Sequence, residues 1–166
     1  MMRKKPMLAY PVSDKPIDYT KPVFMQPKLD GVRCVIQCDN SQVKAYSRTG
    51  KEWKNIDHIL QNLKPFFAKY PDVILDGELY NHDFKNDFEQ IISMVRKTKP
   101  TAEDKLKSAE NVKFYCYDII DETLAFDKRN EFITNYVESS KCIKHCLLYT
   151  SPSPRDLSTS RMPSSA

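Results

Sequence analysis

The stretch Lys28-Leu29-Asp30-Gly31-Val32-Arg33 decides how this sequence is interpreted. It lies between two runs of apolar residues, so it predicts a polar turn between two strands. Gly31 is one of only three glycines, and the other two, Gly50 and Gly77, also stand in polar segments. Because glycine permits positive φ angles and a close approach of the backbone to a ligand, the three glycines predict turns that share one phosphate-binding site.

Composition limits the class of protein before any motif is considered. The 166 residues are 40% hydrophobic and 11% aromatic, which is typical of a globular domain. The net charge of +4 permits a nucleic acid partner without requiring one. The five cysteines lack C-x-x-C spacing, so we expect neither a zinc site nor a disulfide framework, and a cytoplasmic, reducing location. No apolar run approaches the ~18–20 residues that span a membrane, so we expect no membrane partner.

Hydrophobic periodicity predicts a mixture of strands and helices without regular βαβ alternation, which indicates an α+β fold with largely antiparallel sheets. The predicted strands are 23–26, 32–38, 42–47, 73–80 and 112–120, with a hairpin turn at 39–41. The predicted helices are 56–67, 84–95 and 126–137, with Asn55 and Asp83 as candidate N-caps, and Pro65 is expected to bend or end the first helix. Residues 97–110 are expected to form a surface connection or an exposed helix.

Three segments differ in composition. Residues 1–22 contain four prolines and predict an extended lead-in, and residues 23–145 carry the pattern of the main domain. The sequence Cys146–Asp156 resembles the translation of a transposase-type sequencing adapter, so we expect the native coding sequence to end near residue 145. We therefore expect residues 146–166 to be a non-native, disordered tail, the alternative being an ordinary disordered terminus.

The first motif contains a lysine, which must lose its proton before it can act as a nucleophile. Arg33, Arg48 and a divalent metal are the cations that would favour this loss and hold a triphosphate. We expect only one of Asp76 and Glu78 to face the site, with Glu78 binding a metal ion or a ribose hydroxyl. An aromatic ring from the strand around 114–117 would stack on a base.

Four motifs in order resemble those of covalent nucleotidyltransferases, which are the ATP-dependent DNA ligases, RNA ligases and mRNA capping enzymes. K-L-D-G-V-R (28–33) resembles their K-x-D-G-x-R nucleophile motif. S-R-T-G (47–50), L-D-G-E-L (75–79) and F-Y-C-Y-D-I-I (114–120) resemble the motifs that follow it. The resemblance covers about residues 6–140 and implies an adenylation domain with an ATP-grasp-like nucleotidyltransferase fold, in which antiparallel sheets are flanked by helices.

Two further segments extend the resemblance. Phe88–Lys97 is similar to the helix after the third motif in DNA ligases, and Phe126–Arg129 is similar to an arginine-bearing helix near the end of the half-domain. The first of these favours a DNA ligase over the other classes. An RNA ligase and a GTP-dependent capping enzyme remain alternatives, and so does a fragment that binds nucleotide or DNA without catalysis.

The resemblance assigns the catalytic set to the first motif. Lys28 would form the phosphoamide bond to AMP during nick sealing. Arg33 would contact the ribose or the nucleic acid end. Asp30 belongs to the pattern, and its role stays open.

The remaining assignments concern ligands. Glu78 would bind the ribose or the metal ion, Tyr117 would stack on the purine, and Arg48 would contact phosphate. Gln26 joins the residues that bind the nucleotide, and Arg48 and Arg96 are the expected nucleic acid contacts. The implied cofactors are ATP and Mg²⁺ or Mn²⁺, and the implied partner is nicked duplex DNA, bound by a monomer in a phage or bacterial host.

The sequence also departs from the family. No glycine follows Gly77, so the acid-Gly-x-x-x-Lys motif is missing, and Lys141-Cys-Ile-Lys144 has the wrong spacing for the Lys-x-Lys motif. The oligonucleotide-binding OB domain that usually follows is missing as well. We therefore expect a C-terminally truncated adenylation domain that is inactive in full ligation.

Overall fold

The computed structural model describes residues 1–84, 86–146 and 148–151, and the chain divides into two units. The core unit comprises Met1–Pro6 and Leu29–His145, and the small unit comprises Met7–Lys28 with the segment that starts at Cys146. This division differs from the expected domain boundaries at the N-terminal end. Residues 23–28 group with the lead-in instead of the main domain, and residues 1–6 group with the core.

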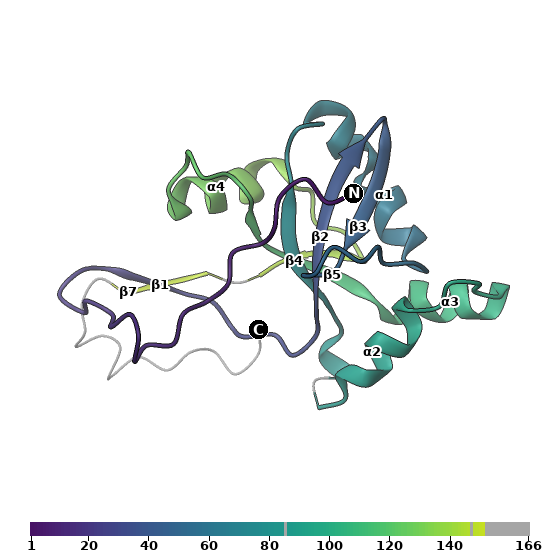
Figure 1. Ribbon diagram of the computed structural model, residues 1–166, viewed down its shortest axis with the longest axis horizontal. Coiled ribbons are helices and arrows are strands. Elements are labelled where there is room, and N and C mark those ends of the chain that lie inside the picture. Colours follow the sequence, from purple (N-terminus) through teal and green to yellow (C-terminus); the bar gives the residue numbers. More distant parts are fainter. Residues whose placement is uncertain (85, 147, 152–166) are drawn as a thin grey trace. The chain divides into compact units, whose positions relative to one another are not determined.

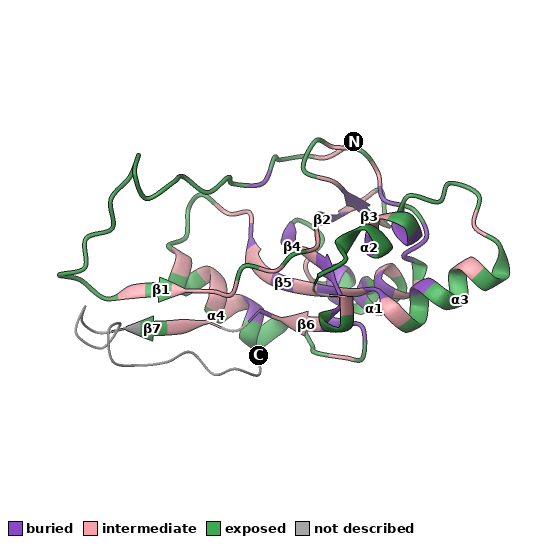
Figure 2. Cartoon of the chain, turned by 90° about the horizontal axis from the view of Figure 1, so that it is seen from below, coloured by how far each residue is buried: buried purple, intermediate pink, exposed green. Residues whose placement is uncertain are grey.

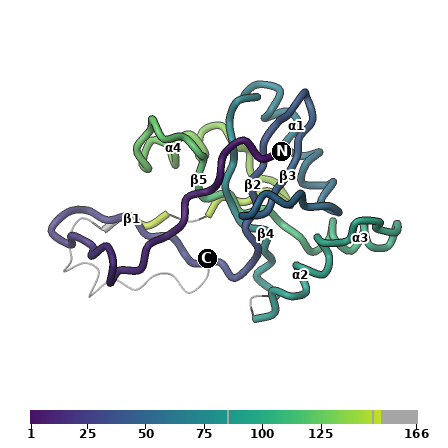
Figure 3. Tube along the Cα trace, in the orientation of Figure 1, coloured from purple at the N-terminus to yellow at the C-terminus, as the bar shows by residue number. Residues whose placement is uncertain are grey.

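A five-stranded sheet forms the centre of the core unit, in the order β3-β2-β4-β5-β6 (Figure 1). Its strands are β2 Val32–Asp39, β3 Gln42–Tyr46, β4 Leu75–Tyr80, β5 Lys113–Ile119 and β6 Ile143–His145. Neighbouring strands are antiparallel except for β5 and β6, which are parallel. The trace in Figure 3 shows β4 beside β2, although more than 30 residues separate them in the sequence. The predicted α+β fold is confirmed.

The β2–β3 hairpin closes as the sequence predicts. Asp39 is paired with Gln42, and the two residues between them, Asn40 and Ser41, have φ angles of 49° and 65°. Positive φ at both central positions is the geometry of a two-residue turn that matches the strand twist. The register of the hairpin is thereby set.

The helices are α1 Asp57–Lys69, α2 Phe88–Val95, α3 Ala102–Asn111 and α4 Phe126–Tyr136, with a short 3₁₀ turn η1 at His82–Phe84. Buried residues of α1, α2 and α4 share one hydrophobic core with one face of the sheet. Figure 2 marks the buried segments of the sheet and the helices in purple. The sheet contributes Cys34, Ile36, Leu75, Leu79, Phe114 and Cys116, and the helices contribute Ile59, Leu63, Ile91, Val95 and Ile133.

Several helix boundaries differ from the prediction. Pro65 does not end α1, because the helix buries Phe66 and Phe67 directly after it and continues to Lys69. Asn55 is not the N-cap, since Ile56 occupies that position and the Asn55 amide donates to Met94 O instead. Asp83 lies in η1, and α2 begins only at Phe88.

Residues 97–110 include the expected exposed helix. Helix α3 begins with a capping box, in which the Thr101 side chain accepts from the Asp104 N–H and the Asp104 side chain accepts from the Thr101 N–H. This reciprocal capping satisfies backbone donors at a helix end that few apolar contacts support.

The described residues of the small unit include one pair of strands. β1 (Val23–Met25) is antiparallel to β7 (Tyr149–Ser151), with Phe24 opposite Thr150. The expectation that residues 146–166 lack structure is therefore wrong for β7, whose backbone pairing does not need a large apolar surface. Residue 147 and residues 152–166 lie outside the described part of the chain. No helix in that described part is long and apolar enough to cross a membrane.

Candidate active site

The face of the sheet opposite to the shared core carries a group of polar side chains, and we call it the polar face. Side chains alternate along a strand, so Arg33 of β2 lies on the other side from Cys34. Glu78 of β4 is directly opposite Arg33, and Asp76 lies two residues earlier on the same strand. The expectation that only one of these carboxylates faces the site is wrong, because residues two apart on a strand share a face.

A β-bulge adds two consecutive residues of β5 to this polar face. Gly77 is opposite Cys116, whereas Asp76 is opposite Asp118, so Tyr117 is the extra residue at the register shift. The burial pattern of β5 alternates until this point and then shows two adjacent half-buried residues, Tyr117 and Asp118. Bulges re-aim side chains in this way and are common beside active sites.

Arg33 is held by two charge-assisted hydrogen bonds. Its Nε and Nη2 donate to Asp76 Oδ1 and Oδ2 at 2.7 and 2.5 Å, and its Cζ lies 5.2 Å from the centre of the Tyr117 ring. Burial alone would lower the pKa of Arg33, but the bonds and charge of Asp76 raise it overall. Burial raises the pKa of Asp76, although Arg33 opposes that effect. The guanidinium is thus fixed in direction by a bidentate pair and lies close to an aromatic ring.

Glu78 lies at the centre of the polar face. It accepts a hydrogen bond from the Tyr117 hydroxyl at 3.4 Å and another from the Gly31 N–H. Burial raises the pKa of Glu78 to about 7, although Arg33, Tyr117 and Gly31 each favour the charged form. Burial also raises the pKa of Tyr117, as do the charges of Asp76 and Glu78. Glu78 therefore changes charge near neutral pH, in direct contact with the aromatic ring of the site.

The three glycines have two different structural roles. Gly50 has a φ of +87°, so the expectation of positive φ is right for this residue. Gly31 and Gly77 are instead required because a side chain would have no room. A Cβ at Gly31 would lie 2.2 Å from Leu79 O, and one at Gly77 would lie 2.2 Å from Tyr115 O.

Other expected site residues come from several parts of the chain. Lys28 is exposed and is the last residue of the small unit before Leu29, and Gln26 is a half-buried residue of the same unit. Asp30 is exposed at the start of the core unit. Arg48 is exposed in the turn after β3, and Arg96 is exposed directly after α2. The structure thus brings Arg33, Glu78 and Tyr117 together on three adjacent strands.

A second ion pair lies next to this cluster, and its pairing was not predicted from the sequence. Asp118 binds Arg129 of α4 through Nε at 2.7 Å and Nη2 at 3.2 Å, and both side chains are largely buried, with exposed fractions of 13% and 12%. One signal was available, because Asp118 interrupts the apolar run from Val112 to Ile120. A carboxylate that is buried in a strand needs a cation or several hydrogen bonds.

Glu78 is also the expected metal ligand. In the described part of the chain, no group of three or more His, Cys, Asp and Glu side chains is arranged to hold a metal ion. A single carboxylate is nevertheless compatible with a Mg²⁺ ion that takes its other ligands from phosphate oxygens and water, which is how Mg²⁺ is usually held with nucleotides.

The profile of the family described as ATP dependent DNA ligase domain matches residues 6–158, which is most of the chain. The chain belongs to this family. No curated protein sequence matches this ligase domain significantly.

Solved structures share the fold of this ligase domain. A Lig E DNA ligase is 20% identical with a TM-score of 0.66 and is matched over 95% of this chain and 56% of its own. The ATP-dependent DNA ligase from bacteriophage T7, solved with ATP, is 16% identical with a TM-score of 0.55, over 83% and 52% of the two chains. An archaeal ATP-dependent RNA ligase is 18% identical with a TM-score of 0.55, over 85% and 34%.

These similarities confirm the predicted adenylation-domain fold of the nucleotidyltransferases. The ligase domain spans between about a third and just over half of the length of the solved structures that it matches.

Proposed function

We propose that this ligase domain is the adenylation domain of an ATP-dependent DNA ligase that seals nicks through a lysyl-AMP intermediate. One observation carries the proposal. Arg33, Glu78 and Tyr117 come from three motifs and three strands, yet they contact one another on one face of the sheet. A cation, a carboxylate and an aromatic ring are the groups that a phosphate, a ribose and a base require.

In the proposed reaction, the neutral Nζ of Lys28 attacks the α-phosphorus of ATP after losing a proton to solvent. A P–N bond forms, the P–O bond to the β-phosphate breaks, and pyrophosphate leaves. The AMP is then passed to the 5′-phosphate of a nick, and attack by the 3′-hydroxyl releases AMP. Transfers of this kind depend on positioning and on cations that stabilise the phosphate charge.

Each site residue has a proposed role in this reaction. Tyr117 stacks on the adenine, and Glu78 binds the ribose or a Mg²⁺ or Mn²⁺ ion that would neutralise phosphate charge. Arg33 contacts the ribose or the nucleic acid end.

Three further residues have proposed ligand contacts outside this cluster, and a fourth belongs to the catalytic motif. Arg48 contacts phosphate and nucleic acid, and Gln26 contributes to nucleotide binding. Arg96 contacts the duplex. Asp30 belongs to the catalytic motif without a defined contact.

The test is covalent labelling of the protein with ATP that carries ³²P in its α-phosphate, followed by denaturing electrophoresis. We expect a labelled band that acid treatment removes, because a P–N bond is acid-labile. Lys28→Ala should abolish the band, whereas Lys21→Ala, a matched exposed lysine of the same unit, should leave it unchanged. A band of full intensity in Lys28→Ala would refute the assignment of the nucleophile.

Two further arms separate the alternative functions. Stronger labelling by GTP than by ATP would favour a capping enzyme. Transfer of AMP to nicked RNA in preference to nicked DNA would favour an RNA ligase. The fold shared with the archaeal RNA ligase is compatible with this alternative. Binding of DNA without any labelled band would favour the non-catalytic alternative.

A further inference from the structure

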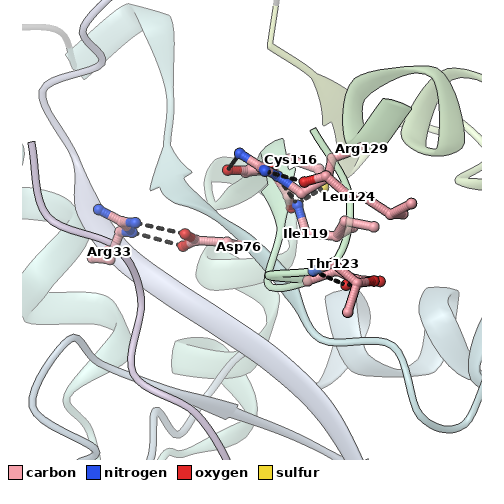
Figure 4. Close-up of polar contacts among 9 residues, drawn as sticks. Arg33, Asp76, Cys116, Ile119, Thr123, Leu124 and Arg129 are labelled. Carbon is pink, nitrogen blue, oxygen red and sulfur yellow. Dashed lines mark hydrogen bonds and ion pairs between the residues drawn. The ribbon is translucent and has the colours of Figure 1, made fainter. Parts of the chain in front are cut away.

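Two bidentate ion pairs occupy neighbouring positions on the polar face. Arg33 holds Asp76, and Arg129 holds Asp118, each through Nε and Nη2. Asp76 and Asp118 are directly opposite each other in the β4–β5 register. The four charges therefore form a row in the order Arg33, Asp76, Asp118, Arg129, which we call the charge row. Figure 4 shows the Arg33–Asp76 contacts and the Arg129 side chain beside Leu124.

The charge row is neutral only when both arginines are present. The exposed fractions of the Arg33 and Asp76 side chains are 22% and 3%, so solvent compensates little for a lost partner. Two carboxylates in opposite positions repel each other. If Arg129 were neutral, Asp118 would be an unpaired buried charge beside Asp76, and Arg33 would be drawn between the two carboxylates.

Tyr117 contacts the groups that such a movement of Arg33 would displace. It directly precedes Asp118 at the bulge, its ring faces the Arg33 guanidinium at 5.2 Å, and its hydroxyl donates to Glu78. The orientation of this ring therefore depends on Asp118 through the backbone and on Arg33 through the contact with its face.

Arg129 is itself held firmly at the start of α4. Its Nη1 donates to Leu124 O at 2.7 Å, and its guanidinium lies 5.4 Å from the centre of the Phe126 ring. The guanidinium thus joins the β5–α4 connection to the strand that carries Tyr117.

We propose that Arg129 is a positioning residue for the nucleotide step. Through Asp118 it holds Tyr117 and Arg33 in the arrangement that binds ATP, although it contacts neither of the reacting groups. This inference rests on the proposed function, and it adds a residue outside the recognised motif contacts to that site.

The first experiment compares Arg129→Gln, Asp118→Asn and the double variant in labelling by ATP at a series of ATP concentrations. Arg129→Gln should raise the half-saturating ATP concentration about tenfold, with a smaller change in the maximal rate, because binding geometry is lost and the nucleophile is not. The double variant should recover most of the affinity, since it removes the unpaired carboxylate together with its cation. A double variant no better than Arg129→Gln would overturn the inference.

Lys128→Gln is the matched control. Lys128 is the neighbour of Arg129 on α4 and forms an exposed ion pair with Glu131 at 3.2 Å. Lys128→Gln removes one positive charge from the same helix and leaves the charge row intact. The dependence of its labelling on ATP concentration should therefore equal that of the unmodified chain. An equal loss in Lys128→Gln would show that net charge alone explains the effect.

A second experiment does not depend on ATP. Asp76 and Arg129 belong to different ion pairs, so independent pairs would give additive shifts of the urea midpoint. If the charge row acts as a unit, Asp76→Asn should lower the urea midpoint much less in the Arg129→Gln variant than in the unmodified chain. The reason is that Arg33, released from Asp76, can then pair with Asp118. Additive shifts would overturn the inference.

The two experiments also separate this inference from the proposed function. Failure of the unmodified chain to take any label would refute the proposed function and the role of Arg129 in it. A labelled chain with additive midpoint shifts, or without recovery in the double variant, would refute the inference alone.

Discussion

At the scale of single residues, Gly31 connects the first motif to the polar face. Its N–H donates to Glu78, and a side chain at this position would meet Leu79 O at 2.2 Å and Glu78 Cγ at 2.9 Å. The backbone carbonyl of β4 cannot give way without disturbing the pairing of β4 with β2. A glycine is therefore needed here for close approach, at a position where its φ is not positive.

Gly31→Ala should lower the free energy of unfolding by about 1–3 kcal/mol, the usual effect of overpacking. It should also weaken the bond between the backbone and Glu78. Urea unfolding measures the first effect, and Thr49→Ala, in an exposed turn, is the control that should change stability by less than about 0.5 kcal/mol. Equal stability of Gly31→Ala and the unmodified chain would show that the strands separate more easily than this geometry implies.

Glu78 should make the stability of the fold depend on pH. Its pKa is about 7 in the folded chain against 4.5 for the free side chain, so between these values the folded state binds the additional proton. Stability contributed by the protonated form is then lost as the pH rises from 4.5 to 7, by up to about 3 kcal/mol for a shift of this size. Glu78→Gln should lack this component.

The measurement is urea unfolding at several pH values, without nucleotide and with a chelator present. Glu110→Gln, at an exposed position, should keep the pH dependence of the unmodified chain. The same slope between pH 4.5 and 7 in Glu78→Gln would contradict the assignment of this titration to Glu78.

At the scale of elements, α1 contains a residue that opposes it. Pro65 lies inside the helix, where it cannot donate a backbone hydrogen bond, and the helix persists because Ile59, Leu63 and Phe67 pack into the core. Local propensity is thus overruled by packing.

Pro65→Ala should raise the free energy of unfolding by about 2–2.6 kcal/mol. Alanine is about 3 kcal/mol more favourable than proline inside a helix, and the more flexible unfolded chain removes about 0.4–1 kcal/mol of this gain. Chemical denaturation measures the change. Pro100→Ala, in the connection before α3, should have the opposite sign, because only the unfolded-state effect applies there.

The sequence predicted the elements that have a hydrophobic pattern within their own residues. The helical spacing from Ile56 to Phe67 predicted α1, and the apolar run from Val112 to Ile120 predicted β5. β6 has only three residues and pairs in parallel with β5, so no local pattern identifies it.

The motifs in turn predicted Arg33, Glu78 and Tyr117, which the structure brings together. Their partners depend on strand register, because Asp76 and Asp118 become neighbours only through the bulge at Tyr117. No pattern along the chain shows which residue a bulge adds.

At the scale of the whole molecule, the two units differ in what stabilises them. The core unit has an extensive hydrophobic cluster, whereas the small unit, as far as its residues are described, has one pair of three-residue strands. Many large apolar side chains in its first segment are exposed: Met7, Leu8, Tyr10, Val12, Ile17 and Tyr19. A two-stranded sheet is marginally stable by itself.

Amide hydrogen exchange should therefore be slowest in β2, β4 and β5 and faster by at least about tenfold in β1, since local opening requires less free energy where few apolar contacts are broken. Mass spectrometry of peptides that cover Val23–Met25 and Leu75–Tyr80 measures the difference. Equal protection of the two peptides would mean that both units open together.

The backbone of Arg33 has one more partner, the indole of Trp53, whose Nε1 donates to Arg33 O at 3.0 Å. Trp53 is the only tryptophan of the chain and is buried. Excitation at wavelengths that the nine tyrosines do not absorb therefore isolates the emission of one fluorophore, which is hydrogen-bonded to the first motif. Its wavelength and lifetime give a label-free optical signal of ligand arrival, which stopped-flow mixing can follow in real time without any change to the sequence.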